Sequence, residues 1–219
     1  MIPHWLLIEL SQLDGITFDT QEVDFSSRAQ KSEEYLAINP KGVVPTLVIH
    51  NDDGSSSSYT ESAAIALLLA ARHPQANLAP HNVQSPQYAK YIETMIYLAN
   101  TVLPAMRDWF YASSDSQSSS ESTIKTIKQM ATRRIGAAWD LLDKQLQDQP
   151  YLVENVVGGE WQPTAADFLV VVLARWSRNF DEPAVKWNNL DGLIRRMTSR
   201  GSWVALKANQ ELEDAEWPQ

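Results

Sequence analysis

The chain has 219 residues, 44% hydrophobic and 21% charged, which is typical of a globular protein with enough chain for a packed core. Its formal net charge of −9 argues against a general binder of nucleic-acid backbones, which needs a basic surface. The absence of cysteine excludes disulfides, thiolate metal sites and a cysteine nucleophile. No apolar run approaches the ~20 residues that span a bilayer. The first residues lack signal-peptide features, so we expect a cytoplasmic protein.

The first third of the chain mixes helical and extended patterns. Apolar residues at helical spacing, alternating apolar and polar residues, and Gly or Pro punctuation locate the boundaries. In chain order they predict a helix at 2–13, a strand at 17–25, a helix at 32–38, strands at 46–50 and 56–59, and a helix at 62–72.

Residues 39–47, NPKGVVPTL, together with Thr-Glu-Ser at 60–62, form the most specific pattern in the chain. A helix ends, Pro and Gly make a turn, and a Val-Pro pair opens an apolar strand. This pattern resembles the glutathione-binding half of a glutathione transferase, with the bacterial beta-class and fungal enzymes as the nearest likeness. The resemblance implies that the peptide bond between Val44 and Pro45 is cis. This geometry would leave the backbone of Val44 open to the cysteinyl part of glutathione. Lys41 is expected to face solvent.

From about residue 86 the pattern becomes wholly helical. Apolar steps of three or four predict one long helix over 92–110, kinked by Pro104, and a second over 124–146. Between them, the Ser-rich stretch 113–122 is expected to be a solvated loop. Thr164 and Asp167 form a capping box that opens a central helix, so Asp167 is interpreted as structural. Two shorter helices are expected at 190–199 and 202–213.

The resemblance gives the expected fold class. It is an α+β, thioredoxin-like N-terminal domain at 1–80 followed by an all-α C-terminal domain at 86–219, joined near 81–85. The N-terminal order α-β-α-β-β-α lacks the first strand of that domain, which in the family is an interior strand. Its absence would leave two rows of backbone groups unpaired. We therefore expect the chain to begin late relative to the family. A shortened gene product, a trimmed chain and a rearranged sheet remain alternatives.

The resemblance also implies a set of glutathione-binding residues. Val44 would offer its backbone to the cysteinyl unit, and Pro45 would shape the turn. Glu61 and Ser62 would hold the γ-glutamyl ammonium and carboxylate, the latter at a helix N-terminus. The alternative is that Ser62 merely caps the helix and that Glu61 favours its dipole. Arg28 falls where the family places a cation for the glycyl carboxylate, although a solvated arginine is equally compatible with the sequence.

The catalytic residue is unknown, because the family's activating hydroxyl or thiol is expected upstream of Met1. Aromatic and sulfur side chains on the kinked and central helices are candidates for the electrophile pocket: Met106, Trp109, Phe110, Tyr111 and Trp176. No metal site is expected.

The leading hypothesis is a homodimeric glutathione transferase-like protein that uses glutathione as co-substrate and conjugates or isomerises a small electrophile. Nucleic acid and membranes are not expected partners. The alternative hypothesis is a non-catalytic binding or dimerisation module of the same fold.

Overall fold

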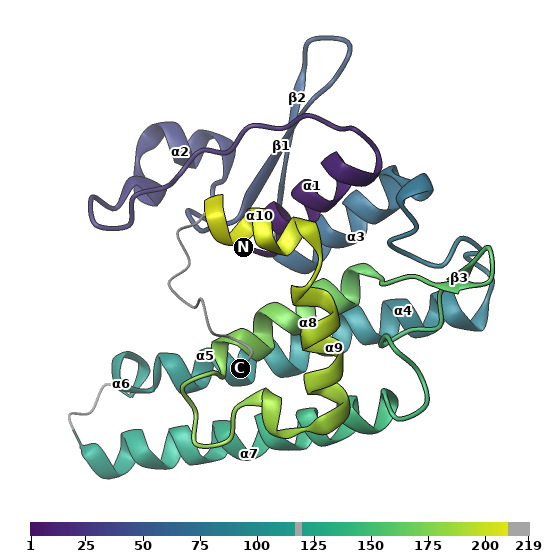
Figure 1. The fold of residues 1–219 in the computed structure, drawn as a ribbon. Coiled ribbons are helices and arrows are strands. Elements are labelled where there is room, and N and C mark those ends of the chain that lie inside the picture. The colour runs from purple at the N-terminus through teal and green to yellow at the C-terminus, as the bar shows by residue number, and fades with distance from the viewer. Residues whose placement is uncertain (117–119, 210–219) are drawn as a thin grey trace.

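The N-terminal part of the chain combines helices with a β-hairpin in the computed structural model, which describes residues 1–116 and 120–209 (Figure 1). The helix predicted at 2–13, the strand at 46–50 and the helix at 62–72 are confirmed, and the second strand is one residue longer than predicted. The elements are α1 (Ile2–Leu13), η1 (Ala29–Lys31), α2 (Glu33–Ile38), β1 (Thr46–His50), β2 (Ser56–Thr60), α3 (Ser62–Arg72) and η2 (Pro74–Ala76).

The strand predicted at 17–25 is wrong, because residues 15–24 form neither helix nor strand. Part of the expected alternation is present, since Ile16 and Phe18 pack against the core while Thr17 is exposed. A strand also needs a ladder of hydrogen bonds to a neighbour. In the described residues the N-terminal sheet is only the antiparallel pair β1-β2, so this extended segment runs without a ladder partner.

The second part of the described chain is mainly helical and lies in the lower half of Figure 1, except for its last helix, which lies beside α1. The proposed division at 81–85 falls between η2 and the first of these helices. The elements are α4 (Pro86–Tyr97), η3 (Leu98–Val102), α5 (Leu103–Phe110), α6 (Ala112–Asp115), α7 (Glu121–Gln145), β3 (Val156–Val157), β4 (Glu160–Trp161), α8 (Ala165–Trp176), η4 (Ala184–Lys186), α9 (Asn188–Thr198) and α10 (Gly201–Asn209).

The long helix predicted over 92–110 is interrupted rather than simply kinked. A π-helical stretch, η3, lies between α4 and α5, and Pro104 stands at the start of α5. Proline has no N–H to donate to the carbonyl one turn earlier, so the helix widens before it. The loop predicted at 113–122 is wrong in part, since Ala112–Asp115 is helical and α7 already begins at Glu121. Its positions 117–119, and the end of the helix predicted at 202–213, lie outside the described residues.

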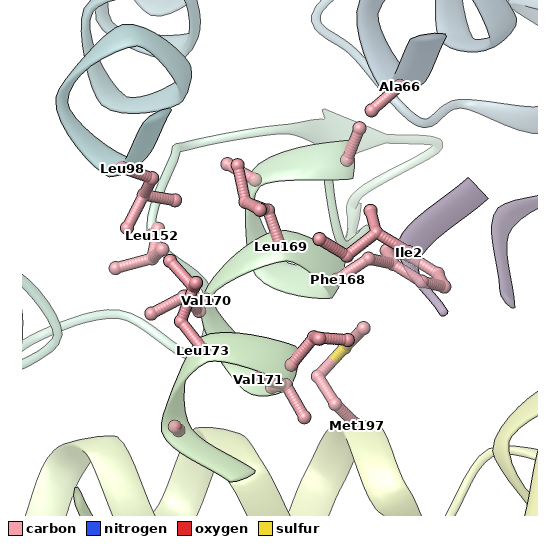
Figure 2. Packing of buried hydrophobic residues seen from close by; sticks show 14 of the residues in the cluster. Ile2, Ala66, Leu98, Leu152, Phe168, Leu169, Val170, Val171, Leu173 and Met197 are labelled. Atoms are coloured by element: carbon pink, nitrogen blue, oxygen red, sulfur yellow. The ribbon is translucent and has the colours of Figure 1, made fainter. Parts of the chain in front are cut away.

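Helix α8 is the centre of the hydrophobic core, as expected from its apolar stripe. Eleven of its residues, Ala165 to Arg175, are buried. Figure 2 shows its side chains surrounded by residues from other elements, among them Ile2 of α1, Ala66 of α3, Leu98 of η3 and Met197 of α9. The predicted capping box of Thr164 and Asp167 is present at its start. One helix therefore organises the packing of both parts of the chain.

A buried polar network joins α1 to the beginning of α10, two elements that lie side by side in Figure 1. Glu9 is 2% exposed, and its Oε1 accepts hydrogen bonds from Arg200, one of them from Nε at 3.1 Å. Ser202 donates to Glu9 Oε2 and accepts from the Trp5 indole at 2.9 Å. Burial works to lower the pKa of Arg200, but the hydrogen bond and charge of Glu9 raise it overall. The network connects the two ends of the described chain.

Candidate functional site

The Val44–Pro45 pair forms the turn between α2 and β1. The peptide bond between the two residues is cis, as the sequence pattern implied. Val44 is 40% exposed, and β1 begins directly after Pro45. The turn therefore lies at the surface, at the start of the hairpin.

Two side chains, Tyr35 of α2 and Asn39 at its C-cap, support this turn with hydrogen bonds. Asn39 is fully buried, and its Nδ2 donates to the carbonyl of Val43 at 2.6 Å and to Thr46 Oγ1 at 3.0 Å. The Tyr35 hydroxyl donates to the same carbonyl at 2.8 Å and lies 2.9 Å from Thr46 Oγ1. Because Val43 and Thr46 flank the Val44–Pro45 pair, these contacts fix both of its ends. Neither Asn39 nor Tyr35 is among the site residues predicted from the sequence.

Replacing Asn39 with alanine should lower the free energy of unfolding by about 2 kcal/mol, because it removes two hydrogen bonds from a buried side chain, to the Val43 carbonyl and to Thr46 Oγ1. Urea denaturation would measure the change. Asn51→Ala is the matched control, since that side chain bonds to serine hydroxyls near the exposed hairpin turn and should cost much less. Equal losses in the two variants would contradict a special role for Asn39.

The start of α3 combines an unusual backbone conformation with an uncapped helix N-terminus. Glu61 has a φ of 71° and a ψ of 115°, a region that non-glycine residues rarely adopt and that is often associated with functional sites. Glu61 is the N-cap and Ser62 the first helical residue, and no side chain makes a capping hydrogen bond there. Ser62 therefore does not cap the helix, and the first N–H groups of α3 are open to an anion.

The Glu61 carboxylate is already in contact with a cation. Lys41 Nζ lies 2.6 Å from Glu61 Oε1 and 3.0 Å from Thr60 Oγ1. Lys41 thus does more than face solvent, although its side chain is 53% exposed. An exposed pair of this kind contributes only about 0–1 kcal/mol, so a ligand can displace it at small cost. Arg28 caps η1 in a left-handed conformation with a φ of 59°, and its side chain is exposed.

An aromatic cluster lies where α5 meets the end of α8 and the loop that follows. Trp109 stacks on Phe180 with ring centroids 4.1 Å apart, and Phe110 lies 6.5 Å from Trp176 and 5.9 Å from Phe180. Phe110 is 46% exposed, so the cluster reaches the surface. The structure brings together three of the predicted pocket residues. It adds Phe180, which sits in a loop where no periodic pattern indicates its direction.

The other two predicted pocket residues belong to α5 and its C-cap but have different surroundings. Met106 is fully buried and belongs to the hydrophobic core. Tyr111 is 54% exposed, and the guanidinium of Arg107 lies 5.0 Å from its ring centroid. Neither is in ring contact with the cluster, and their part in an electrophile pocket stays a prediction.

The described residues hold no group of three histidine or acidic side chains that could bind a metal ion. Within the same part of the chain, no helix is both long and apolar enough to cross a membrane.

Comparison with known proteins identifies relatives of this arrangement. The family profile described as "Glutathione S-transferase, N-terminal domain" matches residues 4–72. Glutathione S-transferase 1 of Schizosaccharomyces pombe is 33% identical over 156 residues, which cover 69% of this chain and 63% of that protein. Glutathione S-transferase 2 of the same yeast is 29% identical, and the match covers 64% of its length. The chain thus spans less than two thirds of these curated relatives.

Solved structures match over nearly the whole chain. The bacterial beta-class glutathione S-transferase of Sphingomonas chungbukensis is 28% identical, with a TM-score of 0.70 and coverage of 94% of this chain and 92% of that one. A glutathione transferase homologue from Sulfitobacter, solved with bound glutathione, is 23% identical, with a TM-score of 0.73 and coverage of 97% and 95%. The described fold is therefore that of these proteins: a thioredoxin-like N-terminal part with a reduced sheet, followed by a helical part.

Proposed function

Because this chain belongs to the glutathione S-transferase family, we propose that it binds glutathione and uses it as co-substrate for conjugating or isomerising a small electrophile. The observation that carries the proposal is the start of α3, where an uncapped helix N-terminus adjoins the strained, acidic Glu61. This feature suits a ligand that carries both a carboxylate and an ammonium group, as the γ-glutamyl end of glutathione does.

Each part of glutathione has a complementary group in the proposed site. The γ-glutamyl carboxylate would accept hydrogen bonds from the first N–H groups of α3 and from Ser62. The ammonium would pair with the Glu61 carboxylate, either displacing Lys41 or sharing the carboxylate with it. The backbone of Val44, next to Pro45, would pair with the cysteinyl amide. Arg28 is the proposed cation for the glycyl carboxylate.

The electrophile would lie near the aromatic cluster of Trp109, Phe110 and Trp176, where the half-exposed Phe110 offers an apolar surface. Tyr111 would border it, and Met106 would support the wall from the core. We also propose that the protein is a cytoplasmic homodimer. Each chain would have two domains, joined by residues 81–85.

Replacing Glu61 with alanine should raise the dissociation constant for reduced glutathione by about tenfold, since a charge-assisted hydrogen bond contributes about 1.5–3 kcal/mol. Isothermal titration calorimetry would measure it. Glu93→Ala is the matched control, because that carboxylate forms an exposed pair with Lys90 on α4 and should leave affinity unchanged. Absence of glutathione binding by the unmodified chain would overturn the proposal.

Glutathione binding without turnover is the second candidate function. Two hydroxyls, of Tyr35 and Thr46, lie beside the Val44–Pro45 turn and are hydrogen-bonded to each other. Tyr35 also donates to the Val43 carbonyl, and Thr46 also accepts from Asn39, so neither hydroxyl is free to activate a thiol. Thiolate absorbance of bound glutathione at neutral pH, together with conjugation of an aryl halide, distinguishes the two candidates. Binding with neither signal would favour the binding module.

A further inference from the structure

Lys41 links the two segments that carry the proposed glutathione site. It belongs to the turn before Val44–Pro45, and it reaches Glu61 at the start of α3, 20 residues further along the chain. The β1-β2 ladder brings these segments together, since Thr46 pairs with Thr60. Lys41 Nζ lies 2.6 Å from Glu61 Oε1 and 3.0 Å from Thr60 Oγ1. The cation therefore bridges two consecutive residues at the point where the hairpin ends and α3 begins.

The backbone of Lys41 is held in place on both sides of its side chain. Its N–H donates to Asn39 Oδ1 at 3.1 Å, and its carbonyl accepts from Lys31 Nζ at 3.3 Å. Gly42 follows with a φ of 60°, and a β-carbon there would lie 2.8 Å from the carbonyl oxygen of Gln30. Glycine alone fits this close approach, so the turn has one well-defined path. Lys41 therefore reaches the site from a fixed backbone position.

The Lys41–Glu61 pair leaves one hydrogen-bonding position open on each partner. An ammonium group carries three N–H donors, and within the described chain Lys41 uses two of them. Among the same residues, Glu61 Oε2 accepts no hydrogen bond, and Oε1 accepts from Lys41. Both side chains are more than half exposed, at 53% for Lys41 and 67% for Glu61. A ligand can therefore reach a free donor and a free acceptor on neighbouring, oppositely charged groups.

We propose that Lys41 determines the specificity of this site by selecting ligands that end in a zwitterionic α-amino acid, a role that rests on the proposed function. The ammonium of such a ligand would bind Glu61 Oε2, while its carboxylate would accept from the third donor of Lys41. The four charges then alternate in sign, and the site gains no net charge. A ligand with an ammonium alone would meet the like charge of Lys41 without compensation, so it would bind less well.

Lys41→Met tests this role when two ligands are compared. One is reduced glutathione, and the other is 4-aminobutyryl-Cys-Gly, which keeps the ammonium of the γ-glutamyl end and lacks its carboxylate. The variant should bind glutathione more weakly and the analogue more tightly, because it removes an attraction from the first complex and a repulsion from the second. Each dissociation constant should change about threefold, the scale of an exposed ion pair, so the preference for glutathione should fall about tenfold. Isothermal titration calorimetry measures both constants.

Lys90→Met is the matched control, because Lys90 forms a similarly exposed pair with Glu93 on α4, at 46% and 67%. It removes the same charge and should leave both dissociation constants unchanged. Lys41→Arg keeps the charge and should keep the preference for glutathione. If Lys41→Met shifts both ligands in the same direction, or leaves the preference unchanged, the proposal is overturned. Failure of the unmodified chain to bind glutathione would instead overturn the proposed function, and this role with it.

Discussion

Replacing Arg200 with methionine should lower the free energy of unfolding by about 3–5 kcal/mol, because it leaves the carboxylate of Glu9 buried without its cation. Glu9 is 2% exposed, and Arg200 and Ser202 provide its hydrogen bonds. Since Arg200 is itself partly exposed, we expect the lower end of this range. Urea denaturation followed by tryptophan fluorescence would measure the change, and Trp5 reports directly on the network.

Arg195→Met is the matched control for Arg200→Met. Arg195 pairs with Asp191 at 2.7 Å on the surface of α9, with half of its side chain exposed, and should cost less than about 1 kcal/mol. The double variant Glu9→Met and Arg200→Met removes both charges, so it should recover much of the loss. A loss as small as that of the control would mean that water reaches Glu9 and that the network does not hold α1 to α10.

The parts of the fold with strong local signals could be predicted from the sequence. The helices at 2–13 and 62–72 have apolar stripes and clear stops, and the capping box of Thr164 and Asp167 marks the start of α8. The hairpin strands are bounded by turn residues. In each case the local preference and the tertiary packing agree, so the sequence pattern suffices.

The errors arise where tertiary context decides. The alternating segment 17–25 has the composition of a strand, but a strand exists only beside a partner, which the local pattern cannot supply. Composition likewise predicted a loop at 113–122, whereas packing of α6 against α5 and α7 keeps Ala112 buried in a helical turn. The Glu9 network joins residues about 190 positions apart, and nothing in the local sequence indicates it.

The sequence pattern located the Val44–Pro45 turn and the start of α3, but not the side chains that hydrogen-bond to them. The pattern around Val44, Pro45 and Glu61 pointed to the correct turn and helix start. Asn39 and Tyr35 were missed because their role depends on how the chain after α2 folds back against these two side chains. The contact of Lys41 with Glu61 spans 20 residues and depends on the hairpin geometry.

Replacing Asp167 with alanine should destabilise the protein by about 3 kcal/mol near pH 5, because two buried backbone N–H groups lose their acceptor. Leu152 N–H donates to Asp167 Oδ1 at 2.8 Å, and Thr164 N–H donates to Oδ2 at 2.7 Å. Thr164 Oγ1 adds a third bond at 3.0 Å. Thr164→Val is a milder comparison, since it keeps both backbone N–H bonds to Asp167, removes only the side-chain bonds of Thr164 and should cost about 1 kcal/mol.

The effect of Asp167→Ala should shrink as the pH rises. Burial raises the pKa of Asp167 to about 6, against the lowering effect of its hydrogen bonds to Leu152 and Thr164. A carboxyl whose pKa is higher in the folded than in the unfolded chain stabilises the fold fully below about pH 4, and this stabilisation is lost as the pH rises through about 6. The difference between the original chain and Asp167→Ala should therefore be about 1–2 kcal/mol smaller near pH 8 than near pH 5. Urea denaturation across this range measures it, and a difference that stays constant or grows with pH would mean that Asp167 is ionised throughout and held by its three donors alone.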